Sequence, residues 1–218
     1  MDFRVDGTDK HDVYNLLIGL VAPRPIALVT SRNEDGGVNA APYSSYNYMA
    51  IDPPMVGLGI AERDDPSKGA ENDRKAKDTG RNIRRAGEFV VNVVTEDLLE
   101  AMNVTGIDFP AEVSEVSEAG LHLAKSSVVS VPRLAEAHAA LECVEHQTIL
   151  VGKSRIVLGR VVAFYIEDRF VDPEGPYVKS EELHAVGRMN GQGAYVRTRD
   201  AFVHVPRVKY ADWQKRKG

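Results

Sequence analysis

Short apolar runs separated by turn residues dominate the hydrophobic pattern of this 218-residue chain. Five of these runs are rich in β-branched side chains and are bounded by Gly, Pro, Asn or Asp, a pattern that is typical of β-strands. The pattern predicts strands over residues 25–31, 54–60, 88–94, 139–150 and 154–171. The last strand is long, and the turn residues 172–175 end it.

Helix signals are fewer, and they predict short helices over residues 12–20, 77–87 and 96–104. Asp12 is the expected N-cap of the first helix, either Asp78 or Thr79 that of the second, and Thr95 that of the third. Gly87 should end the second helix, because glycine accepts the left-handed conformation of a helix C-terminus.

The predicted strands do not alternate with helices of ten or more residues, which argues against a doubly wound parallel sheet. The turn-like segments 33–37 and 152–153 are typical of hairpins between antiparallel strands. We therefore predict a mainly β protein, an antiparallel β-barrel with a few short peripheral helices. Since no repeat or flexible linker divides the chain, we expect one domain over residues 1–218.

The net charge of −5 makes the chain a poor candidate for a nucleic-acid binder or an anionic-membrane binder. The N-terminus lacks the apolar run of a signal peptide, and no apolar stretch is long enough to span a bilayer. We therefore expect a cytoplasmic protein that binds neither nucleic acid nor a membrane.

The single cysteine, Cys143, excludes an intrachain disulfide and a thiolate zinc cluster built from this chain alone. His138, Glu142 and His146 are spaced by four, which on a helix would form one face and a possible metal site. The apolar residues between them favour a strand, on which the two histidines would lie about 26 Å apart. We therefore interpret the three as polar strand positions and Cys143 as a buried structural cysteine.

The sequence contains no Walker A loop and no G-x-S-x-G elbow. Residues 57–62 begin like a dinucleotide fingerprint, but Glu62, Asp64 and Asp65 would place negative charge where a pyrophosphate should lie. We interpret this run as an ordinary strand and turn.

Cations and hydrogen-bond donors gather at the start of the predicted helix 77–87. Because a helix N-terminus presents free N–H groups and the positive end of the helix dipole, such a cluster is a natural phosphate receptor. A solvated helix is the alternative for a charged run. The cluster consists of Lys77, Thr79, Arg81, Asn82, Arg84 and Arg85.

Four segments carry a further pattern, and they occupy residues 22–31, 39–48 with 52–56, 77–93, and 186–191 with Tyr195. In this order and spacing they resemble the flavin reductase-like family, the FMN-binding split-barrel proteins. The resemblance extends from about Tyr14 to Val205. It implies an antiparallel split β-barrel of Greek-key type, with FMN as the cofactor and FAD as the alternative.

The resemblance also implies which residues hold the cofactor. Arg24, between two prolines that stiffen its backbone, joins Lys77 and the hydroxyls of its neighbours around the phosphate. Residues 44–47 are similar to the family loop that lies along the flavin ring. Arg188 belongs to a Gly-rich loop that either closes over the ring or reaches a partner chain. The implied set is Arg24, Thr30, Ser31, Ser44, Ser45, Tyr46, Asn47, Lys77, Thr79, Asn82 and Arg188.

Each implied residue also has a simpler structural interpretation. Considered singly, Asn47, Asn82 and Tyr195 are more readily ordinary loop or surface residues. Considered as a set, Thr30, Ser31, Ser44, Ser45, Lys77 and Thr79 favour a site.

The resemblance implies an NAD(P)H-dependent flavin reductase that passes electrons to free flavin, a partner monooxygenase or another acceptor. A flavoredoxin-like electron carrier with tightly bound FMN and a non-redox flavin-binding protein are the alternatives, and the phosphate and ring residues disfavour the last. Hydride transfer needs stacking and alignment, so we expect no catalytic side chain. The sequence does not indicate NADH or NADPH.

The family is typically homodimeric, which implies a homodimer with the flavin near its interface. The acidic, insertion-like segment 106–132 departs from the family pattern and is expected to shape access to the flavin.

Overall fold

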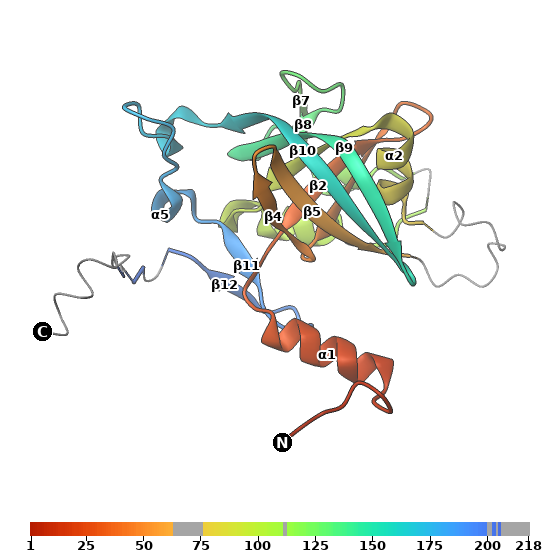
Figure 1. The fold of residues 1–218 in the computed structure, drawn as a ribbon. Coiled ribbons are helices and arrows are strands. Elements are labelled where there is room, and N and C mark those ends of the chain that lie inside the picture. Colours follow the sequence, from red (N-terminus) through yellow and green to blue (C-terminus); the bar gives the residue numbers. More distant parts are fainter. Residues whose placement is uncertain (63–75, 111–112, 200–201, 204, 206–218) are drawn as a thin grey trace, which may run out of the picture.

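The computed structural model describes residues 1–62, 76–110, 113–199, 202–203 and 205. Its main sheet has seven antiparallel strands in the order β3-β2-β6-β9-β10-β5-β4 (Figure 1). These strands are β2 Ala27–Arg32, β3 Val38–Tyr43, β4 Tyr46–Ile51, β5 Pro54–Ala61, β6 Glu88–Val93, β9 Ala139–Val151 and β10 Ser154–Ile166. The smaller sheets join β1 Arg24–Pro25, β11 Val186–Arg188 and β12 Tyr195–Arg197, and pair β7 Leu123–Ala124 with β8 Arg133–Leu134.

The described helices are short, and none of them is long and apolar enough to cross a membrane. Helix α1 stands away from the main sheet, whereas α2 packs beside β2 (Figure 1). The helices are α1 Lys10–Leu20, α2 Asp78–Ala86, η2 Glu96–Leu98, α3 Leu99–Val104, α4 Glu115–Glu118, η3 Asp168–Phe170 and α5 Ser180–Leu183.

The two edge strands of the main sheet, β3 and β4, are consecutive in the sequence. Edge strands β3 and β4 are joined only by Ser44 and Ser45, so the sheet must curl for both edges to meet at this connection. Within the described residues no ladder pairs β3 with β4. The prediction of a mainly β, antiparallel protein is confirmed, but the sheet remains open along this line. We call this opening the β3–β4 gap.

The central strands are apolar on both faces because each face packs against its own core. On β2, Ala27 and Val29 join the core inside the curled sheet. The alternate residue Leu28 faces a second core, where Met102 of α3 packs. This two-sided burial explains why the sequence signal was strongest for the inner strands.

Two of the expected helix starts differ from those in the structure, and local hydrogen bonds show why. Helix α1 begins at Lys10, since the carboxylate of Asp9, and not of Asp12, accepts from the His11 N–H. Thr95 precedes η2 as predicted, but its hydroxyl donates to Asp97 and makes no cap bond. The predicted helix 96–104 therefore divides into η2 and α3.

Gly159 on β10 lies against the ring of Phe89 in the inner core. A Cβ at this position would stand 2.8 Å from Phe89 Cε1 and closer still to Cζ. We expect Gly159→Ala to destabilise the fold by about 1–3 kcal/mol, because overpacking forces the ring from its position. The measurement is urea unfolding, with Gly175→Ala as the control, since a Cβ on Gly175 would have no atom within 4 Å. Equal unfolding midpoints would contradict the expectation.

His138 lies between two carboxylates where β9 begins and β10 ends. Its Nδ1 is 2.8 Å from Glu167, its Nε2 is 2.7 Å from Asp97, and Arg169 pairs with Glu167. Only an imidazolium can donate to both carboxylates at once. Burial opposes this charge, but the hydrogen bonds and charges of Glu167 and Asp97 outweigh it and raise the pKa of His138.

This raised pKa predicts a stability that falls with rising pH. The stabilisation by His138 is complete below its unfolded pKa of about 6.5 and is lost as pH rises through the folded value. We expect His138→Gln to cost about 1.5–3 kcal/mol below pH 6 and less above pH 8. Melting curves across pH provide the test, and the exposed His146→Gln is the matched control. A pH-independent difference would contradict the imidazolium assignment.

Candidate functional site

The N-terminus of α2 lacks a side-chain cap from its own N-cap residue. Lys77 occupies the N-cap position and makes no side-chain cap bond. The predicted caps are turned elsewhere, because Asp78 pairs with Arg81 and the Thr79 hydroxyl lies 3.0 Å from the Asn39 amide. Gly87 ends the helix at φ 71°, as predicted. The first turn of α2 therefore offers N–H groups beside an ammonium group, an arrangement suited to an anion.

Lys77 and Thr79 line a small cavity of about 120 Å³, the α2 cavity. Lys77 is half-buried and Thr79 is buried. The opposite wall comes from the end of β3, at Pro42 and Tyr43, and from Gly106 after α3. Pro42 and Gly106 also line the next cavity, so the α2 cavity adjoins it.

The connection between β3 and β4 lies at the wall of a larger cavity of about 480 Å³, which we call the gap cavity and which β4, β5, β10 and α1 also line. Ser44 and Ser45 line it, and their backbone N–H groups have no acceptor within the described chain. The Ser45 carbonyl accepts from Gly59 N–H at 2.6 Å and holds the connection against β5. Apolar side chains of α1, β4 and β10 complete the wall: Tyr14, Leu17, Ile18, Val21, Met49 and Ile156.

A third cavity of about 300 Å³, the turn cavity, lies beside the β11–β12 turn of residues 189–194. Arg188 ends β11 rather than lying in the loop, and its guanidinium stacks 4.6 Å from the Tyr195 ring centroid. Both residues line the cavity with Gly191 and Gly193. The turn cavity shares Arg24, Tyr14 and Ser44 with the gap cavity.

Arg24 lines both of these cavities, yet most of its donors are bonded within the protein. Its guanidinium donates to the carbonyls of Ile18, Val21 and Met189 at 2.5–2.7 Å and to Ser44 Oγ at 3.4 Å. These bonds involve four of its five N–H groups. The side chain is 8% exposed. Its geometry does not support the phosphate contact expected from the sequence.

Thr30 and Ser31 are fully buried and line none of the cavities described above. The Thr30 hydroxyl donates to the Pro132 carbonyl at 2.7 Å. Ser31 Oγ accepts from the Asn82 amide, which also donates to Asn33. The Thr30 side chain therefore serves packing, whereas Ser31 connects β2 to α2 through Asn82 without lining a cavity.

Tyr46 and Asn47 line the gap cavity in different ways. The Tyr46 ring packs on the inner core, and burial, with Cys143 as a smaller contributor, raises the pKa of its hydroxyl to about 12. Asn47 is exposed, and its side-chain oxygen accepts from Tyr48 N–H. Cys143 itself is buried, and burial followed by the charge of Glu142 raises its pKa to about 12, so the thiol stays protonated.

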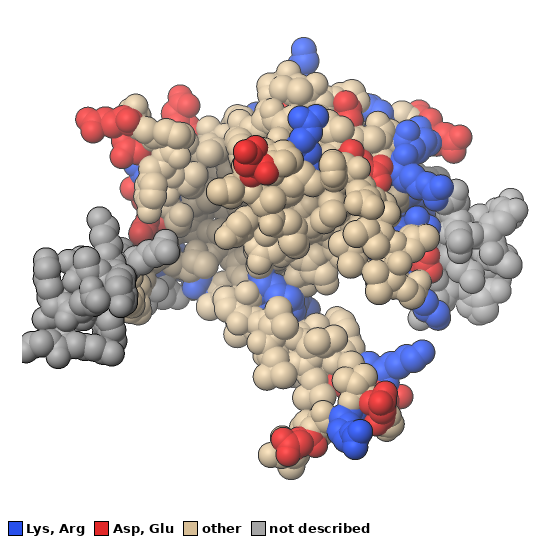
Figure 2. Space-filling model, viewed as in Figure 1, with Lys and Arg blue, Asp and Glu red and all other residues tan. Residues whose placement is uncertain are grey.

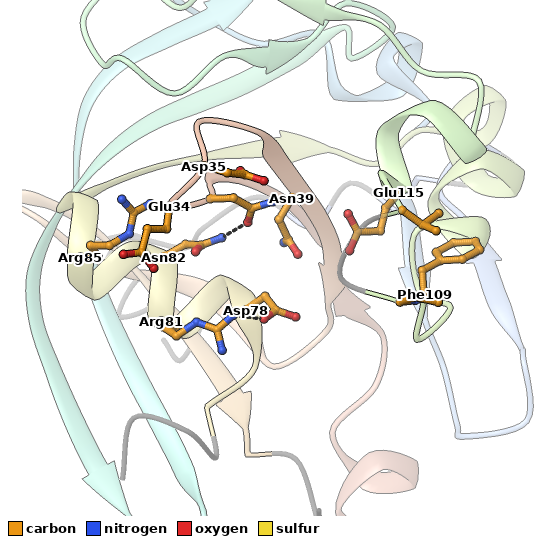
Figure 3. Close-up of a pocket in the computed structure, with 12 residues that line it drawn as sticks. Glu34, Asp35, Asn39, Asp78, Arg81, Asn82, Arg85, Phe109 and Glu115 are labelled. Atoms are coloured by element: carbon orange, nitrogen blue, oxygen red, sulfur yellow. Dashed lines mark hydrogen bonds and ion pairs between the residues drawn. The ribbon is translucent and has the colours of Figure 1, made fainter. Parts of the chain in front are cut away.

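A polar hollow of about 240 Å³ adjoins the α2 cavity (Figure 3). The two share Asn39, Asp78, Phe109 and Glu115. In Figure 3, side chains of α2 face the hollow on one side, and Glu115 and Phe109 lie on the other. Four carboxylates and two guanidinium groups line it: Glu34, Asp35, Asp78, Glu115, Arg81 and Arg85. The hollow is therefore more acidic than basic.

Sequence reasoning missed several residues that line the cavities. Asn39 lies inside one of the four segments that resemble the family but carried no predicted role, although it contacts Thr79. Tyr14 and Gly106 were also missed. For Tyr14, a signal was available in the sequence: large apolar side chains lie on one face of the first helix, and such a face needs a surface to cover it.

Three comparisons relate the chain to known proteins. Residues 20–182 match the model of the flavin reductase like domain. An uncharacterized protein of Deinococcus radiodurans is 41% identical over 207 residues, covering 93% of this chain and 87% of the relative.

Two solved structures are similar over nearly the whole chain. The 2-nitrobenzoate 2-nitroreductase of Pseudomonas fluorescens is 36% identical, with a TM-score of 0.82 over 94% of this chain and 96% of that one. Component B of nitrilotriacetate monooxygenase from Bacillus cereus is 31% identical, with a TM-score of 0.84 over 94% and 98%.

Proposed function

The chain belongs to the flavin reductase-like family, and from this premise we propose that it is an FMN-dependent oxidoreductase of the flavin reductase type. In this proposal NADH or NADPH reduces the bound flavin, and the electrons pass to free flavin or to a partner enzyme. The similarity to a monooxygenase component supports a protein partner.

One observation carries the proposal: donors that suit a phosphate and donors that suit a flavin ring occur at two places that the turn cavity connects. The first is the N-terminal turn of α2 with Lys77, whose side chain makes no cap bond, and this turn fits a phosphate. The second is the pair of N–H groups at Ser44 and Ser45, which have no acceptor among the described residues and fit the polar edge of a flavin ring. Apolar walls around the second place suit the flat face of that ring. A phosphate joined to a large planar ring needs this combination.

The polar hollow favours FMN over FAD. The extra adenylate of FAD carries a second phosphate, which would extend beyond the α2 cavity. Four carboxylates and two guanidinium groups line the neighbouring hollow, so such an extension would meet an excess of negative charge there. Like charges at short range disfavour binding, so a single phosphate is the better fit.

Bound flavin supplies the hydride-accepting N5 atom, and the chain's own residues have to bind and orient it. Lys77 and the α2 turn would hold the phosphate. The N–H groups of Ser44 and Ser45 would donate to the ring and stabilise negative charge on it. Tyr46 remains protonated at neutral pH because its pKa is about 12, so it serves as a wall rather than a base.

We also propose that the protein is a homodimer. None of the 11 residues of α1 is buried, and its Leu17 is 58% exposed. Strand β4 exposes Tyr48, Met49 and Ile51, and Met49 also lines the gap cavity. Figure 2 shows a broad uncharged area over this face, continuous with α1. A second copy would cover these apolar side chains and close the gap cavity.

The test starts with the visible spectrum of the purified protein reconstituted with FMN. Flavin bands that approach one flavin per chain, with bleaching within seconds after anaerobic NADH or NADPH, are the expected result. Failure to bind added FMN would overturn the proposal. Bleaching only by a reduced protein donor would instead assign the flavoredoxin-like carrier. Sedimentation of Leu17→Lys against wild type tests the dimer, and the variant should become monomeric.

A further inference from the structure

Helix α1 depends on few contacts for its position. It buries none of its residues, and it stands away from the main sheet (Figure 1). Its C-terminal end is the exception. There, Ile18 packs so closely on Gly191 that a Cβ on the glycine would lie 2.9 Å from Ile18 Cδ1. At the same end, the carbonyls of Ile18 and Val21 accept from Arg24.

The β11–β12 turn is held by the same side chain. Arg24 Nη2 donates to the carbonyl of Met189, the first residue of that turn, at 2.6 Å. The backbone of Arg24 also pairs with Arg188 across β1 and β11. One buried guanidinium therefore joins α1 to the turn, although the two are far apart in the sequence.

We propose that Arg24 is a positioning residue that fixes α1 and the β11–β12 turn as walls of the flavin site. The inference rests on the proposed function, because only that function makes the gap and turn cavities parts of a flavin site. Both cavities have Arg24, Tyr14 and Ser44 in their walls. A shift of α1 relative to the turn would therefore change the shape of both.

Two physical features suit arginine to this role. The carbonyls at a helix C-terminus carry partial negative charge. A cation stabilises this charge better than a neutral amide does. The planar guanidinium also reaches several acceptors at fixed angles, which a lysine ammonium cannot reproduce. We therefore expect Arg24→Lys to retain the charge but only some of the hydrogen bonds that connect α1 to the β11–β12 turn.

Arg24 also orients Ser44. Because Ser44 Oγ accepts from Arg24 Nε, the hydroxyl hydrogen of Ser44 remains available as a donor. Ser44 lines both cavities, so its hydroxyl can turn toward a ligand there. Arg24 would thus act on the flavin ring through Ser44 and through the walls, and not on the phosphate.

The experiment compares wild type, Arg24→Gln and Arg24→Lys, with the exposed Arg160→Gln as control. FMN and riboflavin are titrated separately, and chymotrypsin cleavage near Tyr14 and Leu17 is followed in the flavin-free proteins. We expect Arg24→Gln to weaken both flavins equally, by about tenfold or more. It should change the visible circular dichroism of bound flavin and accelerate cleavage in α1. Arg24→Lys should fall between wild type and Arg24→Gln.

Other outcomes overturn the inference in distinct ways. Loss of FMN affinity alone would make Arg24 a phosphate contact. Faster cleavage with unchanged flavin binding would leave α1 outside the site. If Arg24→Gln fails to fold, Arg24→Lys decides, and wild-type flavin affinity with an unchanged dichroism spectrum would reject the role. Wild-type protein that binds neither flavin would reject the proposed function itself, while the cleavage rates still report whether Arg24 fixes α1.

Discussion

Replacing Lys77 and Thr79 together by alanine is expected to weaken FMN binding about 100-fold or more while leaving riboflavin binding nearly unchanged. The two side chains line the same cavity at the first turn of α2, where Lys77 makes no side-chain cap bond. Each would donate a charge-assisted hydrogen bond to the phosphate, and such bonds contribute about 1.5–3 kcal/mol each. Riboflavin lacks the phosphate, so it lacks both bonds.

The ratio of the two dissociation constants is the measurement that checks this, because it cancels any general loosening of the site. Lys77→Ala alone should change the ratio of the FMN and riboflavin dissociation constants less than the double variant does. It should not disturb the fold, since Lys77 makes no cap bond. The exposed Lys125→Ala, in the loop after β7, is the control for a lost surface charge. Equal weakening of both flavins by the double variant would remove these residues from the phosphate site.

The inner strands could be predicted because β2 and β6 bury both faces and form continuous apolar runs, while β10 buries alternate residues. Strands β3 and β4 could not, since they are edge strands with mixed composition. Pro42 sits in β3, where a missing N–H costs nothing on the unpaired side, and most of β4 is exposed. Ser44 and Ser45, which line the ring end of the proposed site, connect these two strands, so that end of the proposed site belongs to the least predictable part of the fold.

Side-chain orientation set a second limit on the sequence reasoning. The resemblance selected Arg24 and Thr30 by residue type, but type does not reveal the partners that a fold supplies. Carbonyls of α1 and of the β11–β12 turn take the donors of Arg24, and the carbonyl of Pro132 takes that of Thr30. By contrast, Lys77 and Thr79 were predicted together because a helix start is local in the sequence.

Glu142 illustrates the same limit, and it leads to the largest expected loss of stability. The sequence pattern indicated a polar strand position, yet the Glu142 carboxylate is 1% exposed and accepts four hydrogen bonds. Oε1 accepts from the N–H and hydroxyl of Ser127, and Oε2 from the N–H groups of Val128 and Val129, at 2.6–3.1 Å. The carboxylate thereby organises the loop that covers Val90 in the third core.

Glu142→Gln should destabilise the protein by about 3–5 kcal/mol, because the new amide NH₂ faces donors where an oxygen accepted two charge-assisted bonds. For a chain of this size the melting temperature should fall by about 10 °C. Calorimetry at pH 7 is the measurement, with the exposed Glu118→Gln as the matched control. A fall of only about 1–2 °C would mean that water replaces the lost acceptor.

The same carboxylate fixes the sign of the acid response. Burial opposes its charge, but the hydrogen bonds of Ser127, Val128 and Val129 outweigh burial and lower the pKa of Glu142. Its stabilisation is therefore complete above the unfolded pKa of about 4.3 and is lost as pH falls through the folded value. Wild type should lose more stability than Glu142→Gln as pH falls from 6 toward 3, so their melting temperatures should converge. Parallel curves would show that another carboxylate controls acid unfolding.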